Sequence, residues 1–233
     1  MKIHIIRHGD PNYVDDTLTE KGWREAKFLA ERMSGLCIDD FYSSPLGRAK
    51  DTASLTLEKF GKKAEVLDWL REFHAPITSP FTNGPRIPWD LPPYLWCAEP
   101  KYYDINECFS TPLMESGNVK EEYERVTKGI DDLLLRYGFS REGMLYSGGE
   151  DKTIALFCHF GVGILILSYL LGISPVVAQH NFVFAPTSVT TLVTETDSKG
   201  FSHFRATEVG DTSHLYANGE PVSPSALHPN FEK

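Results

Sequence analysis

Residues 2–9 read KIHIIRHG, in which a short apolar run leads directly into an arginine and a histidine. Residues 2–6 are rich in β-branched apolar side chains, a pattern typical of a buried strand. Arg7 and His8 therefore stand where this first strand is expected to end.

Strands and helices alternate after this first strand. Further strands are expected at residues 38–42, 64–70 and 153–158. Thr19 is a suitable N-cap for a helix over about 20–34, which carries apolar side chains at helical spacing. Ser44 followed by Pro45 predicts a second helix start, because proline suits the first helical position.

The second half of the chain continues this alternation. We expect a helix from about Val119 to Tyr137, a buried helix over 163–171, and a hairpin that pairs 187–196 with 201–208. The last twenty or so residues have the composition of a surface tail.

Between these halves lies a segment without regular periodicity. Residues 74–118 hold eight prolines interleaved with tryptophans and tyrosines. So many prolines exclude a regular helix or a central strand, so we interpret the segment as an insertion. It is expected either to cover the site as a lid, with Trp89, Tyr94 and Trp96 as walls, or to form a packed surface loop or dimer contact.

Together these elements predict an α/β fold: a three-layer α/β/α sandwich around a mostly parallel sheet. The length of 233 residues suits a single domain over 1–233 that carries the insertion at about 74–118. The sequence leaves open whether the protein is a monomer or a homodimer.

Composition excludes several kinds of partner. The formal net charge of −9 argues against nucleic acid or an anionic membrane, although a local site can still bind an anionic small molecule. The four cysteines form no CxxC pair, so neither a zinc cluster nor a disulfide framework is indicated. The first apolar run is too short and polar for a signal peptide, and no later stretch has membrane-spanning length, so we expect a cytoplasmic protein.

Polar side chains follow several of the expected strands. They are Arg7, His8, Ser43, Ser44, Glu72 and His159. In sheets of this kind ligands bind beyond the carboxyl ends of the strands, so these residues are expected at one edge. The sequence therefore predicts a site there.

The residue types at that edge suit phosphoryl transfer. The arginine fork matches phosphate oxygens, and a neutral imidazole such as His8 is a competent nucleophile. Arg48 lies in the first turn of the expected second helix, where backbone N–H groups also favour an anion. His159 as an imidazolium would bind the same oxygens, and Glu72 would supply the proton for a leaving alkoxide.

Five sequence motifs together indicate a resemblance to one known protein family. They are RHG at 7–9, LTEKG at 18–22, SSPLGRAKDTA at 43–53, LRE at 70–72 and CHFG at 158–161. In this order and at this spacing the chain resembles the histidine phosphatase superfamily, which holds the cofactor-dependent phosphoglycerate mutases and broad-specificity phosphatases. The resemblance covers the chain apart from the insertion and the tail.

Carried over residue by residue, the resemblance implies His8 as the phosphorylated nucleophile. Arg7, Arg48 and His159 would bind the phosphate, and Glu72 would act as general acid and then as base. The reaction would need no metal and no organic cofactor. The substrate would be a small phosphorylated metabolite.

Two departures from the family pattern weigh against a glycolytic mutase and leave the substrate open. The run after RHG is Asp10-Pro11-Asn12-Tyr13, and the run Phe73-His74 after Glu72 lacks both the tyrosine–glycine run of the mutases and the Trp-Glu-Gly of many phosphatases. A phosphomutase and a non-catalytic phosphate binder stay as alternatives. A metal-dependent hydrolase that uses histidines is a further alternative, but the sequence contains no HExxH motif or acidic cluster to support it.

Several further residues are assigned secondary roles. Asn12 and Ser44 are candidates for a phosphate oxygen, although capping alone explains Ser44. His74 is a candidate for assisting catalysis or contacting substrate, although a structural role is expected in preference. Asp10 is expected to shape the loop, and His214 has no assigned role.

Overall fold

The centre of the molecule is an eight-stranded sheet with strand order β5-β4-β10-β1-β11-β12-β9-β8. The computed structural model describes residues 1–78 and 84–226. The strands of this sheet are β1 (Lys2–Arg7), β4 (Asp40–Ser43), β5 (Glu65–Val66), β8 (Phe139–Glu142), β9 (Leu145–Gly148), β10 (Thr153–Cys158), β11 (Val189–Thr196) and β12 (Phe201–Asp211). Two short pairs lie apart from it: β2 (Pro11–Asn12) with β3 (Thr17–Leu18), and β6 (Ile77–Thr78) with β7 (Pro85–Arg86).

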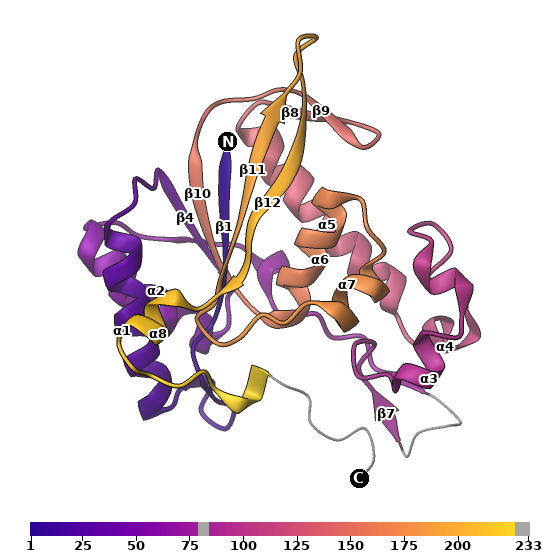
Figure 1. Cartoon of the computed structure of the whole chain (residues 1–233), viewed down its shortest axis with the longest axis horizontal. Coiled ribbons are helices and arrows are strands. Elements are labelled where there is room, and N and C mark those ends of the chain that lie inside the picture. The colour runs from indigo at the N-terminus through magenta and orange to yellow at the C-terminus, as the bar shows by residue number, and fades with distance from the viewer. Residues whose placement is uncertain (79–83, 227–233) are drawn as a thin grey trace.

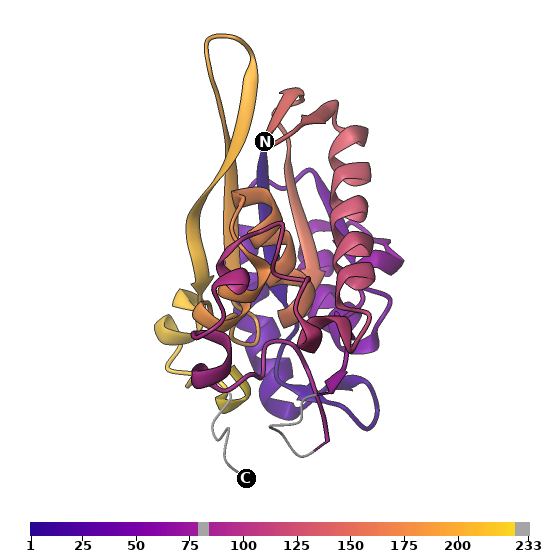
Figure 2. The same ribbon diagram turned by 90° about the vertical axis from the view of Figure 1, so that its right-hand side faces the viewer.

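Helices cover both faces of the sheet. They are α1 (Glu20–Ser34), α2 (Gly47–Phe60), α3 (Pro93–Trp96), α4 (Pro112–Glu115), α5 (Val119–Arg136), α6 (Phe160–Leu171), α7 (Pro175–Asn181) and α8 (Ser213–Ala217), with single 3₁₀ turns η1 (Asp68–Leu70), η2 (Pro100–Tyr103) and η3 (Pro224–Ala226). Helices α1, α2 and α8 lie on one side of the central strands, and α5, α6 and α7 on the other (Figure 1). Figure 2, turned by 90°, shows the β11–β12 hairpin projecting past the start of β1.

The alternation of side chains along β1 explains the three layers. Ile3 and Ile5 belong to the large core that α5 and α6 cover, whereas Ile6 belongs to the smaller core under α1 and α2. Strand β10 divides in the same way, with Leu156 in the first core and Phe157 in the second. Because successive side chains point to opposite faces, an unbroken apolar strand requires cover on both faces.

The predicted α/β fold class with helices on both faces is confirmed, but the sheet is mixed rather than mostly parallel. Strands β5, β4, β10 and β1 run parallel. The remaining four strands pair antiparallel. The physical reason is that β8–β9 and β11–β12 are hairpins, whose short turns force antiparallel pairing.

The expected first helix is confirmed at both ends. It spans Glu20–Ser34, and the Thr19 side chain accepts a hydrogen bond from the backbone N–H of Gly22. The predicted start of the second helix was wrong. Helix α2 begins at Gly47 with Leu46 at the N-cap position, while the Ser44 hydroxyl is engaged with His159 instead.

The bounds of other helices and strands differ more from those predicted. The strand expected at 64–70 is only Glu65–Val66, followed by η1. Helix α6 begins at Phe160, three residues before the expected start, so that His159 takes the N-cap position. The hairpin of β11 and β12 is present as expected, and Asp197 accepts hydrogen bonds from the backbone N–H groups of Lys199 and Phe201 in its turn.

The expectation of a surface tail was wrong for the C-terminal residues that the structure describes. Helix α8 buries His214 and Leu215, and Ser223 is also buried. Glu220 binds Lys21 and Arg24 of α1. Contacts with α1, which is almost 200 residues distant in sequence, hold this segment.

The proline-rich segment forms short elements rather than a long loop. Residues 84–118 contain β7, α3, η2 and α4. Pro80 and its neighbours through residue 83 lie outside the described residues. Across residues 1–78 and 84–226, no helix has the length and apolar character needed to cross a membrane.

Candidate active site

The carboxyl ends of β1, β4 and β10 meet at one edge of the sheet, because these strands are parallel neighbours. His8 follows β1, Ser44 follows β4 and His159 follows β10. All three are buried. The rings of His8 and His159 lie with their centroids 5.1 Å apart. The structure therefore brings together the strand-end residues that the sequence pointed to.

The ring of His8 is fixed by the residue that follows it. Its Nδ1 lies 2.7 Å from the Gly9 carbonyl oxygen, an acceptor, so Nδ1 carries the proton and Nε2 keeps a free lone pair. Burial, and then the charge of Arg7, lowers the pKa of His8 well below its ordinary value. The imidazole is therefore neutral, as a nucleophile must be.

His159 is oriented by Ser44. Its Nε2 lies 2.7 Å from the Ser44 hydroxyl, which already accepts a hydrogen bond from the backbone N–H of Leu46. Among residues 1–78 and 84–226 that hydroxyl has no other acceptor for its own proton, so it donates to Nε2 and the proton of neutral His159 is on Nδ1. Burial, followed by the neighbouring His8, lowers the pKa of His159, so without an anion it is neutral rather than the expected imidazolium.

Arg7 is held by the chain segment that precedes β11. Its Nη1 donates to the Phe184 carbonyl oxygen at 2.6 Å, and its guanidinium lies 5.6 Å from the centre of the Phe160 ring. Burial lowers the pKa of Arg7, while Tyr13 and Glu72 act in the opposite direction. The ordinary value is so high that Arg7 stays charged.

Arg48 has a partner that the sequence analysis missed. Its Nη1 lies 2.5 Å from Asp16 Oδ1, and Asp16 Oδ2 accepts from the backbone N–H of Gly47 at 2.6 Å. Asp16 thus caps α2 from another part of the chain. The guanidinium of Arg48 also lies 5.4 Å from the ring centre of Tyr13. Sequence spacing gave no signal for this pairing, since 32 residues separate Asp16 from Arg48.

Glu72 reaches the same region from the end of η1. Its Oε1 accepts from the backbone N–H groups of Phe73 at 2.8 Å and Val162 at 3.2 Å. Burial raises the pKa of Glu72, although these hydrogen bonds and the charges of Arg7 and Arg48 oppose the rise. A carboxyl group with a raised pKa is suited to donate a proton.

Three donors around His8 lack a partner within residues 1–78 and 84–226. They are Arg7 Nε, Arg48 Nε and His159 Nδ1, all buried. A buried donor left unpaired costs about 1–3 kcal/mol. An anion that accepts from these groups would remove that cost, so the site is built for a negatively charged ligand.

Asn12 and His74 both make local contacts, which for His74 agrees with the structural role expected of it. The Asn12 side chain closes its own turn, accepting from the backbone of Val14 and donating to Asp15. His74 is exposed, and its backbone N–H binds Glu122. Both residues have local structural contacts.

Of the three aromatic residues proposed as walls, the structure places Trp89 beside the site. Its ring lies 5.6 Å from that of Phe160, and a Cβ added to Gly161 would meet both Trp89 at 2.6 Å and Glu72 Oε1 at 2.8 Å. Trp96 instead stacks on His180 at 4.8 Å, and Tyr94 is exposed.

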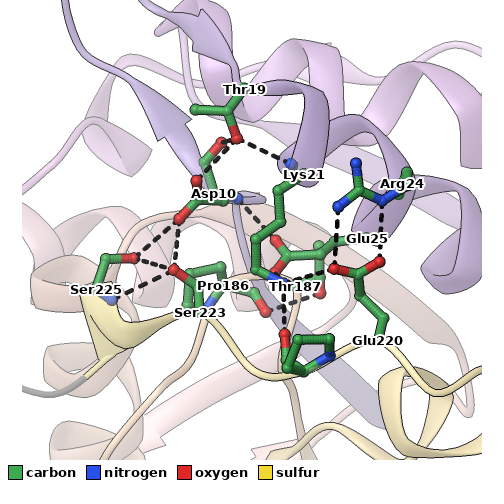
Figure 3. Close-up of polar contacts among 12 residues, drawn as sticks. Asp10, Thr19, Lys21, Arg24, Glu25, Pro186, Thr187, Glu220, Ser223 and Ser225 are labelled. Carbon is green, nitrogen blue, oxygen red and sulfur yellow. Dashed lines mark hydrogen bonds and ion pairs between the residues drawn. The ribbon is translucent and has the colours of Figure 1, made fainter.

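The C-terminal segment braces the turn after His8 (Figure 3). The Asp10 carboxylate accepts from the hydroxyl groups of Thr19 and Ser223, and more distantly from Ser225 at 3.3 Å. The backbone N–H of Asp10 donates to the buried Glu25 at 2.8 Å. The expectation that Asp10 shapes this loop therefore has a structural basis.

Comparison with known proteins supports the same family. A sequence model described as the histidine phosphatase superfamily (branch 1) matches residues 3–82. A 2,3-bisphosphoglycerate-dependent phosphoglycerate mutase of Thermoplasma acidophilum is 44% identical over 73 residues, which are 27% of this chain and only 36% of the mutase. A probable phosphatase of Schizosaccharomyces pombe is 24% identical over 94% of this chain and 93% of its own length.

Solved structures extend the likeness of fold to nearly the whole chain. A phosphoserine phosphatase variant from Entamoeba histolytica, in complex with phosphoserine, has a TM-score of 0.62 at 23% identity, covering 92% of this chain and 98% of that one. A mycobacterial glucosyl-3-phosphoglycerate phosphatase with inorganic phosphate has a TM-score of 0.63 at 20% identity, covering 91% and 98%. The predicted resemblance to the histidine phosphatase superfamily is confirmed.

Proposed function

We propose that this protein is a phosphomonoesterase that transfers the phosphoryl group of a small metabolite to His8 and then to water. The observation that carries the proposal is the set of three buried donors around a neutral imidazole that have no partner among the described residues. A phosphoryl group offers several acceptor oxygens to such donors. Its phosphorus would then lie within reach of the lone pair on His8 Nε2.

The first step forms the Nε2–phosphorus bond as the bond from phosphorus to the ester oxygen breaks. Arg7, Arg48 and the Nδ1–H of His159 bind the equatorial oxygens and neutralise their charge. Glu72, whose pKa is raised by burial, gives its proton to the departing oxygen. An alcohol leaves, and the phosphoryl group stays on His8.

In the second step the Glu72 carboxylate takes a proton from water, and the resulting hydroxide attacks phosphorus. The Nε2–phosphorus bond breaks, inorganic phosphate leaves, and both His8 and Glu72 return to their starting states. Each step needs only groups of this chain, the ester and water.

The similar proteins suggest which esters to try. They include a phosphoserine phosphatase, a glucosyl-3-phosphoglycerate phosphatase and an α-ribazole phosphatase. We propose that the substrate is a small phosphate monoester of this general kind. A panel of such esters, with 3-phosphoglycerate included, is the direct way to rank them.

A phosphomutase is the second candidate, favoured by the 44% identity over 73 residues to the mutase of Thermoplasma acidophilum. A mutase would return the phosphoryl group from His8 to the bound product instead of to water. It would require priming by a bisphosphate. Stimulation of phosphoglycerate isomerisation by 2,3-bisphosphoglycerate would favour the mutase, and release of inorganic phosphate without it would favour the phosphatase.

The test of the proposed function is hydrolysis of p-nitrophenyl phosphate in the presence of EDTA, with the wild type and His8→Ala side by side. We expect hydrolysis by the wild type and none by the variant, together with an acid-labile phosphoenzyme trapped only in the wild type. Equal hydrolysis by the variant would overturn His8 as nucleophile. Loss of wild-type hydrolysis in EDTA would point to metal-dependent chemistry.

A further inference from the structure

Two residues other than glycine have a positive φ in the part of the chain that the structure describes, and both contact the candidate site. They are Asp16, at 50°, and Thr187, at 58°. A positive φ is unfavourable for a β-branched residue such as Thr187. Strained residues of this kind persist only where the surrounding structure over-determines them, and they concentrate at functional sites.

The backbone of Thr187 binds the segment that carries the nucleophile. Its N–H lies 3.1 Å from both the Arg7 and the His8 carbonyl oxygens. One residue further, the carbonyl of Ser188 accepts from the backbone N–H of Arg7 at 3.3 Å. Since Phe184 binds the Arg7 guanidinium, residues 184–188 hold both the main chain and the side chain at the end of β1.

The side chain of Thr187 is bound on its other side by His214. The Thr187 hydroxyl donates to the Pro186 carbonyl at 2.7 Å and lies 3.1 Å from His214 Nε2. Because that hydroxyl proton is already used, Nε2 of His214 is the donor in the second bond. Both residues are buried, so solvent cannot replace either partner.

We propose that Thr187 and His214 are positioning residues for His8: His214 fixes Thr187 in its strained conformation, and Thr187 fixes the carbonyl groups of Arg7 and His8. This inference rests on the proposed function in that it takes His8 as the nucleophile. The two residues act on the main chain behind the imidazole and touch neither substrate nor phosphate. Their role is to hold the direction of Nε2 for in-line attack, where small misalignments are costly.

The consequence is a specific pattern of kinetic effects. Thr187→Gly accepts the positive φ without strain and so preserves the fold, but it removes the hydroxyl that His214 binds. His214→Phe fills the same space without the donor. For both variants we expect kcat to fall about ten- to a hundredfold, while KM and the affinity for inorganic phosphate change less than about twofold.

Conservative variants distinguish loss of the hydrogen bond between residues 187 and 214 from loss of side-chain packing. Thr187→Ser keeps the hydroxyl, and His214→Gln keeps an N–H donor near the position of Nε2, so both should recover most of kcat. Tyr216→Ala is the matched control on the same helix, because Tyr216 is 90% exposed. It should leave kcat unchanged.

Nitrogen-15 NMR of the His8 ring gives a readout that does not need turnover. In the wild type we expect a single tautomer with the proton on Nδ1, and in Thr187→Gly and His214→Phe a mixture of tautomers. This measurement tests the positioning role even if the wild type hydrolyses no ester. Absence of hydrolysis would contradict the proposed function but not the positioning of His8.

The positioning inference is overturned if the folded Thr187→Gly and His214→Phe variants keep the wild-type kcat and tautomer. It is also overturned if the conservative variants lose as much activity as the others, since the hydrogen bond would then not be the cause. Circular dichroism and thermal unfolding verify that each variant is folded before it is assayed.

Discussion

Asp16 binds Arg48 through an ion pair of 2.5 Å, while its second carboxylate oxygen accepts from the N-terminal backbone of α2. An acidic side chain of this chain therefore uses two donors, a guanidinium and a helix N-terminus, that suit a phosphate. The hydrogen bond to the Gly47 N–H and the charge of Arg48 lower the pKa of Asp16 against the opposing effect of burial, so the carboxylate is charged at neutral pH. Arg48 is thus partly neutralised before any ligand binds.

Replacing the charge of Asp16 should strengthen anion binding. Asp16→Asn keeps an acceptor for the Gly47 N–H but removes the negative charge beside Arg48. Because the ion pair is partly exposed, we expect the inhibition constant of inorganic phosphate or vanadate to fall only about two- to fivefold. Asp15→Asn, which removes a carboxylate from the same turn, is the control. Weaker binding by Asp16→Asn would mean that the ion pair is required to orient Arg48.

Glu72→Gln should affect esters according to their leaving group. We expect kcat to fall about 10²–10⁴-fold for alkyl phosphates, and much less for p-nitrophenyl phosphate, whose leaving group needs little protonation. An equal loss for both esters would argue against general acid catalysis by Glu72.

The pH profile offers a second check on Glu72. Burial raises the pKa of Glu72, so its protonated form persists to higher pH than in water. With Glu72 as the acid, kcat for alkyl phosphates falls as the pH rises through that pKa, and Glu72→Gln abolishes this limb. The limb at low pH should remain in the variant, because it reflects protonation of His8.

Gly161→Ala should disturb Glu72 from the opposite side. The added Cβ would approach Trp89 and Glu72 Oε1 to less than 3 Å, so both side chains, or the backbone of Gly161, must move. If Glu72 is the general acid, we expect kcat to fall about tenfold or more, since small displacements of a proton donor are costly. Gly35→Ala serves as the control, because its Cβ would meet no atom closer than 3.5 Å. Unchanged kcat in Gly161→Ala would show that the added Cβ is accommodated without affecting Glu72 as a proton donor.

The contacts of Glu220 should stabilise the protein in a pH-dependent way. Hydrogen bonds from Arg24 and Lys21 lower the pKa of Glu220 to about 2 in the folded state, below its ordinary value of 4.5. Its stabilising effect is therefore complete above about pH 4.5 and is lost as the pH falls toward 2. We expect Glu220→Gln to lower the free energy of unfolding by less than about 1 kcal/mol at pH 7, because its partners Lys21 and Arg24 are partly exposed to solvent.

Thermal unfolding of the wild type and Glu220→Gln across this pH range checks that expectation. The difference between them should shrink as the pH is lowered. Glu58→Gln, at an exposed position of α2, should show no such trend. A difference that grows on acidification would contradict the assignment.

Local sequence patterns were sufficient to predict the structure wherever a residue contacts its immediate neighbours in the chain. The apolar run of β1 and β10, the Thr19 cap of α1 and the turn at Asp197 were all predictable in this way. The gathering of His8 and His159 also followed from sequence, because carboxyl ends of parallel strands share one edge of the sheet.

The predictions of local structure were wrong where a residue far away in the sequence binds a polar group that was expected to bind its own neighbours. Ser44 has the sequence of a helix cap, but its hydroxyl binds His159, 115 residues away, and α2 takes its cap from Asp16. The C-terminal residues resemble a polar tail, yet Ser223 reaches Asp10. Neither competitor leaves a signal near the residue it affects.

The alternation of strands and helices, and the residues at the strand ends, follow from the amino-acid sequence alone. The protonation and orientation of those residues depend on the folded structure. Burial keeps His8 and His159 neutral and raises the pKa of Glu72, and burial depends on which elements cover the strand ends. The physical reason is that periodicity and capping act over a few residues, whereas desolvation and pairing of charges depend on chain segments that meet only on folding.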